Sequence, residues 1–90
     1  MPTASPGGTK ADTTTADASV AERVLPVVGA NIVARREQLG MSQRRLAENA
    51  DVDRAFLRTV ERGERTPTLV FLARLAGALN TTVHKLTRGV

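Results

Sequence analysis

Residues 43–62, QRRLAENADVDRAFLRTVER, decide the fold of this chain of 90 residues. They predict two short helices joined by only a few residues, and the small Ala47 leaves room where the two helices would cross steeply. The residues that would form a shared apolar seam are Leu46, Ala50, Val52, Leu57 and Val60. This is the spacing that a close-packed helix-turn-helix needs.

The second of these helices carries arginines at a regular spacing. At about 100° per residue, Arg54, Arg58 and Arg62 fall within roughly 80° of one another. Ala55 and Thr59 lie beside them on the same face. The far side of the helix is apolar, with Phe56, Leu57 and Val60. Such a helix can bury one face and present the other to a negatively charged partner.

Capping residues divide the rest of the chain into further helices. Gly40 and Gly63 predict helix ends, because glycine readily adopts the left-handed conformation that often follows a helix. N-terminal caps precede the helices expected over 43–50, 54–62, 69–79 and 83–88, namely Ser42, Asp53, Thr68 and Thr82. No alternating run of four or more β-forming residues remains, so we predict an all-α domain.

The first helices of the domain are expected on either side of a proline. Ser19 and Glu22 have capping-box spacing, which predicts a short lead-in helix that Pro26 interrupts. A longer helix over 26–40 should follow. Its expected inward positions are Val28, Ile32 and Leu39.

Residues 1–19 differ in composition from the rest of the chain. They contain no Leu, Ile, Val or Phe, so burial cannot offset the entropy of ordering them, and we expect a disordered tail. The domain would then span residues 20–90, which carry twelve Lys and Arg residues against seven Asp and Glu residues. A basic excess in a small domain favours a nucleic-acid partner, although a solvated charged surface gives the same composition.

Several classes of protein are disfavoured by what the sequence lacks. The chain has no cysteine, no apolar run long enough to span a bilayer and no signal-peptide pattern, so we expect a cytoplasmic protein without a membrane partner. It also lacks a phosphate-binding glycine loop and a plausible catalytic nucleophile, so we expect neither an enzyme nor a cofactor. His84, the single histidine, has no other metal ligand at suitable spacing.

Three stretches resemble the lambda-repressor-like helix-turn-helix proteins, also called the XRE family. They are RREQLGMSQRRLA at 35–47, VERGERTPTLVFLARLAGAL at 60–79 and NTTVHKL at 80–86, within a resemblance that covers residues 27–88. The resemblance implies a compact five-helix DNA-binding domain that acts as a transcriptional regulator, either a repressor or an autoregulator. The words DRAFLRTVERGERTP at 53–67 are similar to the small controller proteins of restriction-modification systems.

The chain departs from the family pattern at two places. Asp51 stands where the family commonly has glycine in the turn. Because aspartate tolerates a left-handed backbone better than most residues, we expect the turn to be kept. Val70 and Phe71 stand where the family more often has polar residues, and they form either a surface for a partner or part of the core.

The resemblance also implies which residues contact double-stranded DNA, because in this family the helix over 54–62 enters the major groove. Arg54 would donate two hydrogen bonds to a guanine, unless it pairs with Asp51 or Asp53 instead. The expected base-reading residues are Arg54, Ala55, Arg58 and Thr59. The expected phosphate contacts are Ser42, Gln43, Arg44, Arg62, Arg65 and Thr66.

Arg36 and Glu61 match a pair that forms a salt bridge between two helices in several family members, so we expect a structural role for them. The resemblance further implies a homodimer on a palindromic operator. The apolar residues placed for that contact are Leu79, Val83 and Leu86, of which Leu79 and Leu86 also suit the core. A different class stays open: an antitoxin that covers a toxin, or an adaptor that contacts RNA polymerase.

Overall fold

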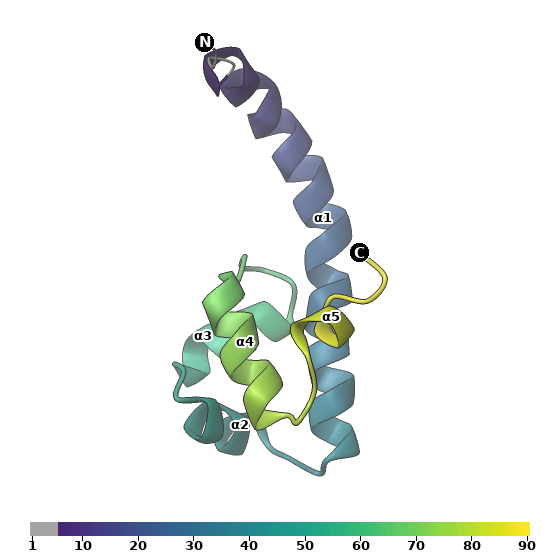
Figure 1. Ribbon diagram of the computed structural model, residues 1–90, viewed down its shortest axis with the longest axis vertical. Helices are drawn as coiled ribbons and strands as arrows, with labels where there is room; N and C mark the ends of the chain where they lie inside the picture. Colours follow the sequence, from purple (N-terminus) through teal and green to yellow (C-terminus); the bar gives the residue numbers. More distant parts are fainter. Residues whose placement is uncertain (1–5) are drawn as a thin grey trace.

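The computed structural model describes the backbone of residues 6–90 and the side chains of residues 18–90. Five helices follow one another: α1 (Pro6–Gln38), α2 (Gln43–Ala50), α3 (Arg54–Glu61), α4 (Leu69–Ala78) and α5 (Val83–Leu86). Short helices α2 to α5 pack beside the second half of the long α1 (Figure 1). The described backbone contains no strand, so the prediction of an all-α, five-helix fold is confirmed.

Helix α1 is longer than the sequence predicted. A single helix runs from Pro6 through Pro26 to Gln38, without the expected break, and it includes residues 6–19, for which we expected a disordered tail. Proline removes one backbone hydrogen bond, but an established helix extends by one bond for each residue that it orders. Gly63 lies directly against this part of α1, since a Cβ atom built on it would be 3.0 Å from the Cα atom of Pro26. The part of the expected tail before Pro6 lies outside the described residues.

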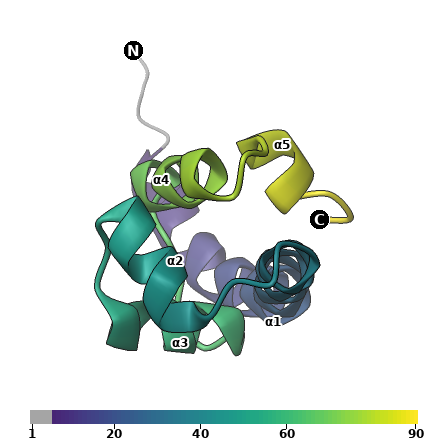
Figure 2. The ribbon, with the colours of Figure 1, turned by 90° about the horizontal axis from the view of Figure 1, so that it is seen from below.

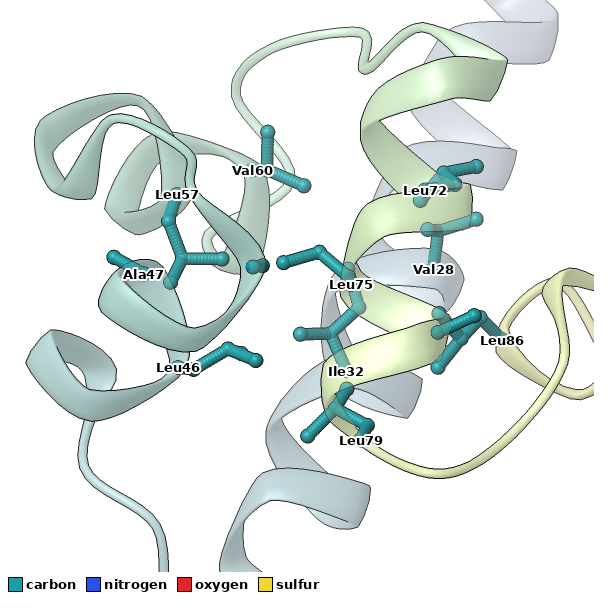
Figure 3. Close-up of a cluster of buried hydrophobic side chains, with 12 residues drawn as sticks. Val28, Ile32, Leu46, Ala47, Leu57, Val60, Leu72, Leu75, Leu79 and Leu86 are labelled. Atoms are coloured by element: carbon teal, nitrogen blue, oxygen red, sulfur yellow. The ribbon is translucent and has the colours of Figure 1, made fainter.

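The core fills the space between α1 and the four short helices. Its largest fully buried side chains include Ile32 from α1, Leu46 from α2, Leu57 from α3 and Leu75 from α4 (Figure 3). The inward positions Val28 and Ile32 were predicted correctly. Leu39 was predicted wrongly, because 42% of it is exposed. Helix α1 ends at Gln38, and the chain then turns away through Gly40 at φ +65°.

The N-terminal caps lie where the sequence placed them. The side chain of Ser42 accepts a hydrogen bond from the backbone N–H of Arg45 at 3.0 Å. In the same way Asp53 Oδ2 caps α3 at 2.7 Å, and Thr68 and Thr82 cap α4 and α5 at 3.0 Å and 3.1 Å. Each cap satisfies a backbone donor that has no partner within the helix, and this fixes where the helix begins.

The turn between α2 and α3 keeps the shape that glycine would give it. Asp51 adopts the left-handed conformation, with φ 56° and ψ 51°, as the sequence predicted for this position. Its backbone carbonyl accepts a hydrogen bond from Arg74 Nη1 of α4 at 2.9 Å. A residue in the second turn of α4 therefore supports the left-handed position in the turn.

Helix α1 approaches the end of α3 very closely at Gly29. A Cβ atom built on Gly29 would lie 2.5 Å from the carbonyl oxygen of Glu61 and 2.7 Å from that of Val60. Such distances are far inside van der Waals contact, so the approach requires glycine. Viewed from below, α2, α3 and α4 lie to one side of α1 (Figure 2). Gly29 is thus the point at which α3 is seated against the long helix.

Two polar side chains of α1 hold the C-terminal ends of other helices. Arg35 donates from Nε to the carbonyl oxygen of Leu79 at 2.9 Å and from Nη2 to that of Asn80 at 3.1 Å. Asn31 Nδ2 donates to the carbonyl oxygens of Leu86 at 3.0 Å and Arg88 at 2.9 Å. These donors satisfy carbonyl groups that a helix end leaves without partners.

Candidate nucleic-acid interface

Helix α3 presents a basic face to solvent. Leu57 and Val60 are buried, with exposed fractions of 0% and 1%, and they fix the helix against the core. Arg54, Ala55 and Arg58 point the other way and are exposed, as the sequence predicted from their angular positions. These three side chains are therefore accessible to another molecule.

Thr59, the fourth expected base-reading residue, is placed differently from the other three. It is half-buried, and its hydroxyl donates a hydrogen bond to the carbonyl oxygen of Phe56 at 2.7 Å. Because the hydroxyl proton is engaged within the helix, Thr59 has its acceptor lone pairs left for a partner. A base contact by Thr59 stays a prediction, restricted to a base that donates.

The start of α2 lies close to the start of α3. Arg36, Ser42, Gln43, Arg44 and Arg54 line one open depression between these helix starts. Two of the lining residues, Arg44 and Arg54, are arginines without an ion-pair partner among residues 18–90, and the backbone N–H groups at the start of α2 add positive potential. The depression therefore suits a phosphate group.

Arg54 is available for an external contact. The two ion pairs found among residues 18–90 are Arg36 with Glu61 and Arg74 with Asp51. The alternative in which Arg54 pairs with Asp51 or Asp53 is thus not what the structure contains. No side-chain hydrogen bond within the described part of the chain engages Arg54 or Arg58 either.

The chain after α3 continues the basic surface. Arg62 caps the C-terminus of α3 with its backbone, and the side chains of Arg62, Arg65 and Thr66 are exposed. Ser42 and Arg44, at the start of α2, are exposed as well. All five residues are accessible to a phosphate backbone, and their DNA contacts stay predictions.

Arg36 and Glu61 are joined as the resemblance implied. Arg36 Nε lies 2.8 Å from Glu61 Oε2, and Arg36 Nη2 donates to Glu61 Oε1 at 3.0 Å. The two side chains are only 14% and 4% exposed. Hydrogen bonding to the Glu61 carboxylate raises the pKa of the Arg36 guanidinium, against the opposing effect of burial. This forked pair ties α1 to the end of α3.

Gln43 is part of the same network, which the sequence did not predict. Its Nε2 donates to Glu61 Oε1 at 2.7 Å, and it is half-buried. The side-chain amide has two N–H donors, so one remains for a phosphate. The signal in the sequence was the glutamine at the first position of α2, which suggested a phosphate contact but not its tie to Glu61.

The expected dimer residues separate into two groups. Leu79 and Leu86 have exposed fractions of 0% and 2%, so they belong to the core and cannot touch a second chain. The prediction of a dimer contact is therefore corrected at these two positions. Val83 is half-buried at the start of α5 and reaches the surface.

The described helices also include none that is both long and apolar enough to cross a membrane.

Comparison with known proteins agrees with this arrangement. A helix-turn-helix family model matches residues 32–86. The control protein C.SmaI of Serratia marcescens is 42% identical over 60 residues, which cover 67% of this chain and 71% of that protein. The crystal structure of the restriction-modification controller protein C.AhdI from Aeromonas hydrophila aligns with a TM-score of 0.67 and 35% identity. That alignment covers 69% of this chain and 94% of C.AhdI.

A second solved relative has a protein partner. SinR, in a structure of the SinR–SinI complex, is 32% identical to this chain and aligns with a TM-score of 0.67. The alignment covers 69% of this chain and 61% of the SinR chain. The match over most of the ordered helices, together with the exposed basic face of α3, identifies the chain as a DNA-binding transcriptional regulator of the XRE-type helix-turn-helix family.

Proposed function

We propose that the protein represses or autoregulates transcription by binding a specific, palindromic operator as a homodimer. The observation that carries this proposal is the pair of exposed arginines on α3, Arg54 and Arg58, which have no ion-pair partner among residues 18–90 and lie next to the open depression at the start of α2. A basic face alone would give nonspecific binding. A basic face at the start of a helix-turn-helix recognition helix can also read bases.

Each residue of the basic face has a proposed task. Arg54 donates to O6 and N7 of a guanine, and Ala55 contacts a thymine methyl group. Arg58 lies one turn further along α3 and contacts a base or a phosphate. Thr59 beside it accepts a hydrogen bond from a base, because its own hydroxyl proton is engaged with Phe56. The residues proposed to hold phosphates are Ser42, Gln43, Arg44, Arg62, Arg65 and Thr66.

A dimer is proposed because one helix-turn-helix covers few base pairs. A handful of contacts rarely gives the affinity of roughly 10⁻⁸ M that operator selection needs. Two copies related by a two-fold axis double the contacts and require half-sites about one helical turn, roughly 34 Å, apart. Val83 is the residue we propose for the contact between copies.

Selection of bound sequences from random DNA tests the operator. We expect an enriched palindrome with guanine at the positions nearest Arg54, and a steep loss of affinity as salt rises. Recovery of no preferred sequence would contradict the proposal and leave a nonspecific DNA-binding protein.

The dimer is tested by Val83→Asp. This variant should stay folded, because Val83 is only half-buried, and should sediment as a monomer in analytical ultracentrifugation. It should bind a full operator little better than a half-site. A Val83→Asp protein that remains dimeric would show that α5 is not the interface.

A second candidate function is binding to another protein, such as a toxin or RNA polymerase. It is favoured by Leu69 and Val70, two adjacent apolar side chains at the start of α4 that are 70% and 64% exposed. The complex of the related SinR with SinI adds support. A toxin-sized reading frame beside the gene would favour an antitoxin, whereas a neighbouring methyltransferase and endonuclease would favour a controller protein.

A further inference from the structure

One face of α4 contacts residues just before and just after Asp53, the N-terminal cap of α3. Phe71 meets Phe56 edge to face, with ring centroids 5.1 Å apart and ring planes at 84°. One helical turn later, Arg74 Nη1 donates to the carbonyl oxygen of Asp51 at 2.9 Å. Asp53, the cap of α3, lies between these two contact points in the sequence. Residues three apart share a helix face, so both contacts come from the same side of α4.

Apart from the Asp53 cap, the first three residues of α3 have few other supports. The buried residues of α3, Leu57 and Val60, and its ion-paired Glu61 all lie further along the helix. Arg54 and Ala55 are exposed, and Phe56 is the first residue of α3 that is partly buried. The main neighbours of α3 are α1 and α2. Phe56 is therefore the residue through which α4 can hold the start of α3.

The turn before α3 also needs support. Asp51 has a left-handed backbone, which costs a residue with a side chain more than it costs glycine. The hydrogen bond from Arg74 to its carbonyl oxygen holds the peptide group that follows this residue. The Arg74 side chain is half exposed, so its position is not imposed by packing in the core. Its effect is to fix the direction in which the chain enters α3.

We propose that Phe71 and Arg74 are positioning residues for base reading, which set the angle at which the first turn of α3 presents Arg54 to DNA. This inference rests on the proposed function of α3. A bidentate contact from a guanidinium to a guanine depends on direction, whereas a phosphate contact tolerates displacement. A small tilt of the first turn should therefore weaken operator binding more than it weakens binding to random DNA.

The test compares four variants on the selected operator and on random DNA of equal length. Phe71→Ala should lower operator affinity by roughly threefold to tenfold, the range expected for an aromatic pair, and change random-DNA affinity by less than about twofold. Phe71→Tyr keeps the ring edge and should preserve the ratio of the two affinities. Arg74→Gln should lower the ratio by roughly twofold, as for one hydrogen bond. Leu69→Ala, a change at an exposed neighbour, should leave it unchanged.

Binding is measured well below the melting temperature of each variant, and circular dichroism confirms that each is folded. Because Arg74 is half exposed, Arg74→Gln tests the proposal even if Phe71→Ala unfolds. Equal losses on operator and random DNA in Phe71→Ala and Arg74→Gln would refute the positioning role and leave only a role in stability. A wild-type protein without any sequence preference would instead refute the proposed function, and with it the reading role.

Discussion

Arg36 and Arg54 line the same depression but serve two different regions of the molecule. Arg36 belongs to the junction of α1 with the end of α3, where it is forked onto Glu61 and mostly buried. Arg54 belongs to the exposed start of α3, where it has no acidic partner among the described residues. The comparison shows that burial and a carboxylate neighbour, rather than residue type, separate an arginine that holds the fold from one that can bind a ligand.

Arg36→Ala should break the junction and have the largest effect. Glu61, which is 4% exposed in the intact protein, would lose its cationic partner, and the cost of an unpaired buried charge is expected to be about 3 kcal/mol in the free energy of unfolding. Urea denaturation measures this loss. In a double-mutant cycle with Glu61→Ala, strictly additive losses would show that the two side chains do not stabilise each other.

Gly29→Ala should strain the same junction from the other side. The added methyl group would lie 2.5 Å from the Glu61 carbonyl oxygen, and overpacking of this kind costs about 1 to 3 kcal/mol. Gly77→Ala is the matched control, because a Cβ there meets nothing within 4 Å and should slightly stabilise α4. Thermal unfolding compares them, and a Gly29→Ala protein as stable as the control would mean that the helices separate without cost.

Arg54→Ala should leave stability unchanged and act on DNA alone. We expect operator binding to weaken by about 1 to 3 kcal/mol, with a much smaller change on random DNA. Fluorescence anisotropy with both DNAs gives the comparison. If the two affinities fall by the same factor, Arg54 contacts phosphate and the division between reading and positioning residues has to be redrawn.

Arg44→Ala should have the smallest effect of the four. As a phosphate contact at the exposed start of α2, it should weaken operator and random DNA alike. The slope of log affinity against log salt should fall by about 1. An unchanged slope would mean that Arg44 is a solvated surface residue.

The sequence predicted the short helices well because their N-terminal ends are set by interactions between residues close in the sequence. Ser42, Asp53, Thr68 and Thr82 cap helices through hydrogen bonds that span only three residues. The angular spacing of Arg54 and Arg58 likewise follows from the pitch of a helix. The resemblance to the XRE family supplied the pairing of Arg36 with Glu61, which spacing alone could not.

What the sequence did not predict depends on contacts between distant residues. The close approaches of Gly63 to Pro26 and of Gly29 to the end of α3 are both contacts between residues far apart in the chain. The contact of Phe71 with Phe56 decided between the two roles left open for that residue. Val70 stays exposed beside it, so the two adjacent residues took different roles.

The hydrogen bonds from α1 to the ends of α4 and α5 have a consequence for cooperativity. Arg35 and Asn31 reach carbonyl groups between 44 and 57 positions away in the chain, and Arg23 reaches the carbonyl oxygen of Val90, 67 positions away. The last two helices therefore cannot fray without releasing α1. The amide hydrogen of Leu86, which is bonded to the carbonyl oxygen of Thr82 at 3.1 Å, should therefore exchange with solvent at a rate set by opening of the whole domain rather than by local fluctuation.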